Sequence, residues 1–576
     1  MIISSLRDKI EEILEKEHGQ LKKGVSVEIP PPNFGDFAIN CHSLRKILGM
    51  DSSDSVMDVV EHLYNELKRE EKKEEWLFHV TPEKHGYVSF FVDYYKLAFF
   101  VFKKINEEGD KYGLGNVGNG KKVMIEYPSQ NTHKEFHIGH LRNVCIGNCL
   151  VELYKKSGFE VIPVNYLNDF GRHVVKCLWA IQKFHKDEEP SDNKQKWLGQ
   201  VYAEAEEKLK DNEGAKEELD ELQKKLEDHD PEIWELFKKT RDWSVEGFDR
   251  ILAELGTKHE KVFFESDIKE KGQKIVDELL KKDIAKEGEG GAIIVDLEDD
   301  SLDIALIRKS SGAGVYMTSD LALAKEKFEN YDVEESINIT GNEQDFYFKQ
   351  LFKILELYGF KPKMTHIGYG LVNLPSGKMS SRKGNVILYE DLRDQVMDKM
   401  LRETKKRHDD WDEEKIKNNA EKLTQAVLKF TMQKHESNKV VSFDFDEAVS
   451  FEGFSAPYIL YVVARINSLL KKSKAESRKP KVNFSLLEEV EEKRLLLLIA
   501  EYPEIIKKAL ERYNPSTITK YCFDLAKAFN DYYNKYRITD AESEELVRMR
   551  MAVCGSVKFV LENALNLLSI ETVEEM

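Results

Sequence analysis

The sequence predicts an α/β fold, in which a doubly wound parallel sheet with a helical insertion stands between a small α+β domain and an all-α bundle. Three observations support this prediction. Residues 123–165 contain an apolar run, a helix-spaced apolar pattern and a second apolar run, which is typical of a strand–helix–strand unit. Residues 175–285 are rich in Lys and Glu and carry leucines at helical spacing. From Tyr389 onward the apolar residues follow helical spacing.

The first region, residues 1–112, is expected to be a separate α+β domain. Its predicted elements are a helix through Leu6 and Leu14, a strand through Val25 and Ile29, helices reaching Leu48 and Leu67, and a strand from Gly86 to Val92. The glycine-rich stretch from Gly113 to Gly120 then predicts a linker into the sheet domain.

The sheet domain is expected to cover residues 120–388, with the helical insertion at about 175–285. Its strands are predicted at 123–125, 160–165, 291–296, 304–307, 336–340 and 366–372. Residues 312–320 predict a glycine-rich turn, a short strand and a polar helix start. A helical connector over 389–450 and a helical domain over 451–576 complete the predicted organisation.

Composition limits the partners. Lys and Arg number 87 against 105 Asp and Glu, a formal net charge of −18, which excludes a wholly basic nucleic-acid coat but allows a local basic face. No stretch approaches the ~20 apolar residues of a membrane helix, and the apolar start of the chain is too short for a signal peptide. The six cysteines form no Cys-x-x-Cys pair, so we expect reduced thiols in a cytoplasmic protein.

Two separated motifs predict a polyphosphate site. The run Val123–Ile125 enters a Pro-Ser-Gln-Asn loop, and a helix is expected to start near His137, a layout that presents backbone N–H groups to an anion. His137 and His140 share one face of its first turn, and Gly139 permits close approach. The second motif follows the last predicted strand and contributes Lys378, Met379, Ser380, Arg382 and Lys383.

Taken together, His-Ile-Gly-His and Lys-Met-Ser-Ser-Arg-Lys-Gly resemble the two signature motifs of class I aminoacyl-tRNA synthetases. More narrowly, the chain resembles the arginyl-tRNA synthetases over nearly its full length. The runs Glu-Tyr-Pro-Ser-Gln-Asn, Gly-Val-Tyr-Met-Thr-Ser-Asp and Asn-Glu-Gln fall where that family has them. The resemblance implies a Rossmann-like catalytic domain, an N-terminal domain of the tRNA-binding type and a C-terminal anticodon-binding domain.

The resemblance also implies the reaction and its residues. Arginine would be joined to tRNA(Arg) through an arginyl-adenylate, with ATP and Mg²⁺, by a monomer that needs bound tRNA for activation. The catalytic residues would be Lys134, His137, His140 and Lys378. ATP would contact His137, Gly139, His140, Lys378, Met379, Ser380, Arg382 and Lys383. Arginine would contact Glu126, Ser129, Asn131, Tyr316, Asp320 and Gln344, with Glu126 and Asp320 on the guanidinium beside Tyr316. No protein residue is assigned to a metal.

One position departs from the general class I pattern. Ser381 stands where the second lysine of Lys-Met-Ser-Lys-Ser is usual. In the arginine family this loss commonly accompanies a lysine just before the histidine motif, and Lys134 occupies that place. The substitution therefore favours arginyl identity over an inactive enzyme.

Three alternatives stay open at this point. Another class I specificity is one, although a cysteine enzyme should bring a Cys/His zinc cluster and a glutamate enzyme should present arginines to its substrate. A catalytically silent tRNA-binding paralogue is the second, and a small-molecule nucleotidyltransferase is the third. Asp320 taken alone also fits an ordinary helix N-cap.

Overall fold

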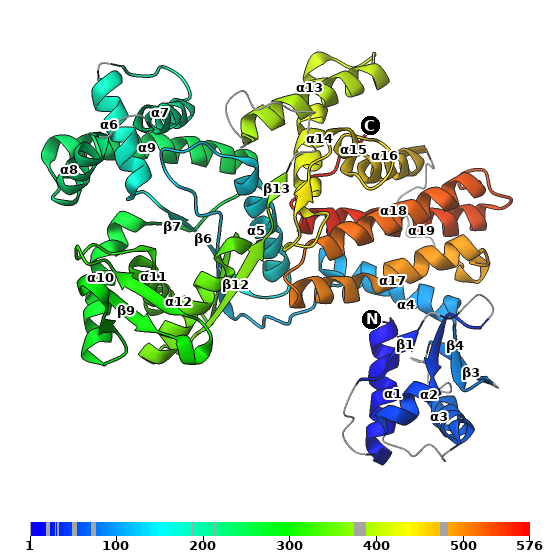
Figure 1. The fold of residues 1–576 in the computed structure, drawn as a ribbon. Coiled ribbons are helices and arrows are strands. Elements are labelled where there is room, and N and C mark those ends of the chain that lie inside the picture. Colours follow the sequence, from blue (N-terminus) through cyan, green and yellow to red (C-terminus); the bar gives the residue numbers. More distant parts are fainter. Residues whose placement is uncertain are drawn as a thin grey trace.

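The computed structural model describes residues 2–18, 24–28, 30, 34–48, 55–70, 77–83, 85–186, 188–210, 214–373, 387–472 and 482–576. Its central sheet has the strand order β12-β11-β5-β6-β7, and all of these strands run parallel. The bounds are β5 Lys122–Glu126, β6 Glu160–Leu167, β7 Lys261–Phe264, β11 Glu335–Gly341 and β12 Lys363–Tyr369. Figure 1 shows this sheet near the centre of the molecule.

The two faces of the sheet are covered by different helices. Successive side chains of a strand point to opposite faces. Val123 and Ile125 of β5 therefore join the apolar core that contains α5 (Ile138–Lys156), whereas Met124 joins the core formed with α10 (Glu265–Lys281), α11 (Tyr316–Tyr331) and α12 (Asp345–Tyr358). Because both faces are buried, β5 carries a continuous apolar run, as is typical of a parallel sheet. The doubly wound sheet predicted from the sequence is confirmed.

The helical insertion lies to one side of the sheet and consists of α6–α9 (Figure 1). Its helices are α6 Arg172–Phe184, α7 Lys194–Leu209, α8 Ala215–Glu227 and α9 Pro231–Glu254. The sequence placed Lys261–Phe264 inside this helical stretch, and that was wrong: it forms β7 at the edge of the main sheet, beside β6. With only one strand neighbour, β7 is short and lacks the apolar run of a central strand.

The predicted strands at 291–296 and 304–307 exist, but they do not extend the main sheet. They form β9 (Ile293–Asp296) and β10 (Ile304–Arg308) of a separate antiparallel sheet with β8 (Lys286–Glu287). The short strand predicted within 312–320 is replaced by an earlier helix start, because α11 begins at Tyr316. Asp320 consequently lies inside this helix and is not its N-cap, which is Val315.

The C-terminal half is helical apart from a short parallel pair, β13 (Val372–Asn373) with β14 (Val441–Ser442). Its helices are α13 Tyr389–Arg407, α14 Glu413–Gln433, α15 Phe445–Ala448, α16 Ala456–Lys472, α17 Val490–Glu511, α18 Ser516–Lys535 and α19 Glu544–Leu567. Helices α16–α19 pack on one another and α14 packs on α5. The all-helical prediction after Tyr389 therefore missed only β14 among the described residues.

The N-terminal domain contains an antiparallel sheet of order β1-β2-β4-β3 with helices α1–α4. The bounds are α1 Ile2–His18, β1 Val27–Glu28, β2 Phe37–Asn40, α2 Cys41–Ile47, α3 Val56–Glu70, β3 Phe78–Glu83, β4 Tyr87–Val92 and α4 Tyr94–Glu108. The sequence prediction lacked β2, β3 and α4. Helix α4 packs on α17, so this domain lies against the C-terminal bundle (Figure 1).

In the described part of the chain, no helix is both long enough and apolar enough to cross a membrane. All six cysteines are free and buried.

Candidate active site

A cavity of about 480 Å³ opens at the carboxyl ends of β5 and β11. Ligands of open parallel sheets bind at this edge, because the loops that follow the strands meet there. All six residues predicted to contact the amino acid line the cavity: Glu126, Ser129, Asn131, Tyr316, Asp320 and Gln344. His140 lines it too, so the structure brings the predicted amino-acid residues and one histidine of the phosphate motif to one place.

The histidine pair forms the N-terminal cap of α5. Nδ1 of His137 accepts hydrogen bonds from the backbone N–H groups of Gly139 (3.1 Å) and His140 (3.4 Å), and Nδ1 of His140 accepts one from the N–H of His137 (3.3 Å). The rings stack with centroids 3.7 Å apart. This reciprocal arrangement satisfies backbone donors that a helix start otherwise leaves unpaired.

The cap fixes the protonation of both rings. A ring nitrogen that accepts a hydrogen bond carries no proton, so each neutral ring carries its proton on Nε2. Burial, helped by Lys134, lowers the pKa of His137 to about 4, and burial lowers the pKa of His140 well below its usual value. Both rings are therefore neutral at pH 7, and Nε2–H is the donor that each can offer to an anion. The sequence predicted that backbone N–H groups at the helix start would face the anion. In the structure, the N–H groups of Gly139 and His140 are already bonded to His137 Nδ1.

The packing of the His137 ring explains why position 139 is a glycine, and the sequence did not reveal this. A Cβ atom at this position would lie 3.0 Å from Cε1 and 3.1 Å from Nδ1 of His137. Such contacts are tighter than side chains normally tolerate, so glycine leaves the room in which the His137 ring folds back over the helix start.

Asp320 is the acidic centre of the cavity. Its carboxylate accepts a hydrogen bond from the Tyr347 hydroxyl. Burial, together with the nearby Glu126, raises the pKa of Asp320 to about 7, although Tyr347 and Lys327 act in the opposite direction. Asp320 is thus poised to ionise fully when a cation enters, because a positive charge nearby favours the carboxylate.

Glu126 is held by one partner on the neighbouring strand β11 and one on helix α11. Asn338 Nδ2 donates to Oε1 (2.9 Å), and Lys327 Nζ lies 2.7 Å from Oε2. Lys327 is only 1% exposed, so this is a buried ion pair. Two of the cavity's carboxylates, Glu126 and Asp320, therefore face one buried ammonium, while a third, Glu343, is exposed. An ionised Asp320 then offers a negative charge that Lys327, already paired with Glu126, does not fully balance.

Some polar atoms in the cavity wall make no hydrogen bond within the described part of the chain. Within the described residues, Ser129 Oγ, Asn168 Oδ1 and Asn338 Oδ1 are buried without a hydrogen-bond partner, and all three residues line the cavity. Buried polar groups are nearly always paired in folded proteins. Such a set of open acceptors beside two carboxylates fits a ligand rich in N–H donors.

Lys134, predicted to act on the triphosphate, lies near the histidine pair, since its charge helps to lower the pKa of His137. It is absent from the described cavity wall, and its ammonium lies over the Tyr202 ring of α7, 5.0 Å from the centroid. Burial lowers its pKa. Lys378, Met379, Ser380, Arg382 and Lys383 lie outside the described residues.

Several cavity residues were missed by sequence reasoning. They are Lys327, Asn338, Tyr347 and Tyr166. Behind them, burial together with Asp320 and Asp169 raises the pKa of Glu265 to about 8, which keeps it neutral at pH 7. Lys327 stands two helical turns after Asp320 on the same face of α11. The spacing alone does not show that Lys327 is buried or that it pairs with Glu126. In the described residues, no cluster of three or more His, Cys, Asp or Glu is arranged to hold a metal ion.

Comparison with known proteins agrees with this geometry. Residues 103–446 match the family model described as "tRNA synthetases class I (R), catalytic domain", and residues 459–576 match the "DALR anticodon binding domain". An arginine–tRNA ligase of Clostridium botulinum is 33% identical over 96% of this chain and 96% of its own length.

Solved structures share the fold. The arginyl-tRNA synthetase of Thermus thermophilus superposes with a TM-score of 0.80 at 21% identity, covering 100% of both chains. That of Plasmodium falciparum gives a TM-score of 0.80 at 20% identity, covering 100% of this chain and 99% of the other. The matched catalytic model, the matched anticodon-binding model and the full-length relatives show that this chain belongs to the class I arginyl-tRNA synthetase family.

Proposed function

We propose that this chain attaches L-arginine to tRNA(Arg) through an arginyl-adenylate formed from ATP. The observation that carries the proposal is the cavity at the ends of β5 and β11. It gathers carboxylates, phenols and open amide and hydroxyl acceptors beside a neutral histidine of the phosphate motif. A guanidinium is a planar cation with five N–H donors, and it matches this chemistry.

Arginine recognition is assigned mainly to Asp320. Its carboxylate is oriented by Tyr347 and has no buried lysine of its own, whereas Glu126 is already paired with Lys327. Glu126 then acts as a second, fixed acceptor, and Tyr316 lies at the same end of α11. Ser129, Asn131 and Gln344 are assigned to the amino and carboxylate groups of arginine.

Activation requires the arginine carboxylate to attack the α-phosphorus of ATP and expel diphosphate. Such a reaction is promoted by positioning the reactants and by stabilising charge on the phosphates. The Nε2–H groups of His137 and His140 supply preorganised neutral donors. Lys378, Met379, Ser380, Arg382 and Lys383 are assigned to ATP on their motif alone, with Lys378 as a catalytic cation. Lys134 is kept as a catalytic candidate, because its charge acts on both histidines of the motif.

Mg²⁺ fits as the companion of ATP. It would neutralise phosphate charge, and phosphate oxygens with water would be its main ligands.

The remaining regions are assigned to tRNA. We propose that residues 1–112 and 451–576 contact tRNA, and that 120–388 with its insertion and the connector 389–450 carry the reaction. The chain is proposed to act as a monomer. Free, buried cysteines support a reducing cytoplasm.

A charging assay tests the function. The full chain is incubated with ATP, Mg²⁺, total tRNA and each of the labelled amino acids in turn. We expect acid-precipitable label from arginine alone. Charging of a different amino acid would disprove the assigned specificity, and no charging at all would support a silent tRNA-binding paralogue.

A further inference from the structure

The start of α13 forms part of the wall behind the histidine pair. The N–H of Ile138 donates to the carbonyl oxygen of Ile387 (2.9 Å), and the N–H of Tyr389 donates to that of Phe136 (3.0 Å). Tyr389 is completely buried, and its ring packs edge-on against Phe136 at 5.8 Å. Phe136 in turn packs against His140 at 5.1 Å. Any displacement of the first turn of α13 therefore reaches the histidine cap through direct contacts.

The helical insertion holds the other side of the same loop. Gln195 Nε2 of α7 donates to the carbonyl oxygen of Lys134 (2.7 Å). The buried His133 donates its backbone N–H to Ser244 Oγ of α9 (2.9 Å), and its Nε2 lies 2.8 Å from Thr240 Oγ1. The packing is close enough that a Cβ on Gly199 would lie 2.1 Å from Cγ of Glu135. Residues 133–135 are thus fixed by α7 and α9.

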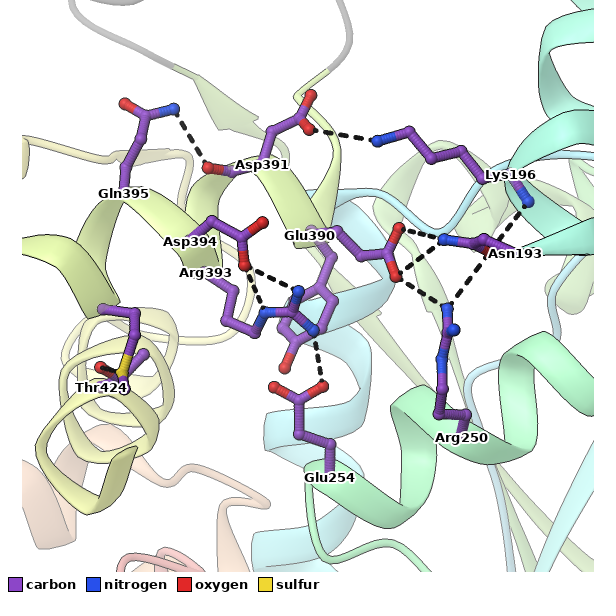
Figure 2. Close-up of polar contacts among 12 residues, drawn as sticks. Asn193, Lys196, Arg250, Glu254, Glu390, Asp391, Arg393, Asp394, Gln395 and Thr424 are labelled. Atoms are coloured by element: carbon purple, nitrogen blue, oxygen red, sulfur yellow. Dashed lines mark hydrogen bonds and ion pairs between the residues drawn. The ribbon is translucent and has the colours of Figure 1, made fainter. Parts of the chain in front are cut away.

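A polar cluster joins these two supports to each other. Asn193 Nδ2 donates to both carboxylate oxygens of Glu390 (3.3 and 3.1 Å), and Arg250 Nη2 donates to Oε1 of Glu390 (2.8 Å). Arg250 also donates to Oδ1 of Asn193 (3.2 Å), which closes the triangle shown in Figure 2. Asn193 precedes α7, Arg250 lies on α9 and Glu390 lies in the first turn of α13.

We propose that Asn193, Arg250 and Glu390 form a positioning clamp for the ATP-dependent step. The clamp completes a closed series of contacts. Through it the insertion contacts α13, α13 contacts the first turn of α5, and residues 133–135 of the loop before α5 contact the insertion. None of its three residues lines the described cavity, so they act through the histidine loop and not on arginine. The inference rests on the proposed function, since the step it supports is arginine activation.

The exposure of these side chains indicates that the clamp can position the histidine loop while contributing little to the free energy of folding. The Arg250 side chain is 52% exposed, whereas that of Glu390 is 17% exposed. An ion pair with one exposed partner contributes little to folding. Its loss should leave the chain folded while it loosens the geometry around His137. Misplacement of reacting groups by about 1 Å can lower rates on the order of a hundredfold.

Kinetics of arginine-dependent ATP–diphosphate exchange, measured with tRNA present, test the clamp. For Glu390→Ala and Arg250→Ala we expect kcat/KM for ATP to fall by about tenfold or more, while KM for arginine stays within about twofold and the melting temperature is unchanged. The matched control is Lys399→Ala, which removes the Lys399–Glu403 pair (3.1 Å) within the same helix and should behave as wild type. Equal effects on ATP and arginine, or none on either, would overturn the proposal.

Hydrogen exchange on the ligand-free full chain supplies an independent readout. Glu390→Ala should exchange faster than Lys399→Ala at the amides of Ile138 and Tyr389, which bond across the α5–α13 junction. Equal exchange in the two variants would refute the clamp even if activity changed. If the wild-type chain charged no amino acid, the proposed function would fail, and the exchange experiment would still decide whether the clamp exists.

Discussion

At the scale of single residues, the cavity is organised around a charge balance. Glu126 and Asp320 supply two carboxylates, and the buried Lys327 supplies one ammonium next to Glu126. An isolated buried charge is costly, whereas a paired one is tolerated. The free site can therefore keep Asp320 partly protonated at neutral pH until the arginine guanidinium arrives.

The pH dependence of arginine binding follows from this balance. The pKa of Asp320 is raised to about 7, so its protonated, neutral form accumulates as the pH falls below 7. Arginine binding requires the ionised form. We therefore expect KM for arginine to rise as pH falls, by about tenfold for each unit well below the pKa. Steady-state arginine KM measured between pH 6 and 8.5 checks this.

The variant Lys327→Met is the control for the pH dependence of the arginine KM. Lys327 lowers the pKa of Asp320, so its removal should shift the inflection to higher pH. The other groups around Asp320 are Glu126, Tyr166, Tyr347 and Glu265, and the substitution leaves all four in place. A flat arginine KM in the wild type, or an unshifted inflection in Lys327→Met, would contradict the charge balance.

The sequence predicted the cavity residues that belong to motifs, but it did not predict the side chains with which they pair. The six amino-acid residues, from Glu126 to Gln344, were predicted because they occupy motifs that resemble those of the arginyl-tRNA synthetases. Lys327 was missed because Ala-Lys-Glu-Lys-Phe has the pattern of an ordinary solvent-exposed helix. Its burial depends on Glu126, which lies on a strand far away in the sequence, and one-chain periodicity carries no information on such a pair.

At the scale of elements, α5 is the helix on which the site depends. It is buried along nearly its whole length between the sheet and α14. Its Arg142 is completely buried and donates to the carbonyl oxygens of Gly370, Leu371, Glu436, Ser437 and Lys439. Burial lowers the pKa of Arg142 to about 10, so the guanidinium stays charged at pH 7. Arg142 thereby joins α5 to the end of β12 and to the turn after α14.

Arg142→Met should destabilise the fold strongly. The methionine fills much of the space but leaves buried carbonyl groups unpaired, and each costs about 1–3 kcal/mol. We expect a loss of at least about 3 kcal/mol, seen as a lower denaturant midpoint by circular dichroism. Arg548→Met is the matched control, since Arg548 pairs with Glu544 at the surface of α19 and should change stability by less than about 1 kcal/mol. A similar loss in both variants would show that Arg142 has no special anchoring role.

Element types were predicted better than sheet membership. The strands β9 and β10 were found from their apolar runs, but their separate antiparallel sheet was not, because strand patterning does not specify the partner. The short β7 was hidden in a Lys- and Glu-rich stretch. The capped start of α5 agreed with the prediction because His137 and Gly139 act locally.

At the scale of the whole molecule, the two regions proposed to contact tRNA form one packed body. A linker was expected to begin at Gly113, and the residue just before it, Tyr112, donates its hydroxyl to the carbonyl oxygen of Ile499 (3.1 Å) and stacks on Tyr502. Gly113 adopts φ +83°, and a Cβ there would lie 2.8 Å from the Tyr502 ring. The N-terminal domain is therefore docked on α17, and tRNA would meet the two regions in a fixed relative position. A linker pattern in the sequence does not reveal such docking.

The most direct test of the arginine site is the effect of Asp320→Asn on substrate selectivity. This change keeps the shape of the side chain and the Tyr347 contact but removes the charge that faces the guanidinium. We predict that KM for arginine rises by roughly 10- to 100-fold, while KM for ATP and tRNA binding stay within about twofold of wild type. An unchanged arginine KM, or an equal rise in the KM for ATP, would contradict the assignment of this cavity to arginine.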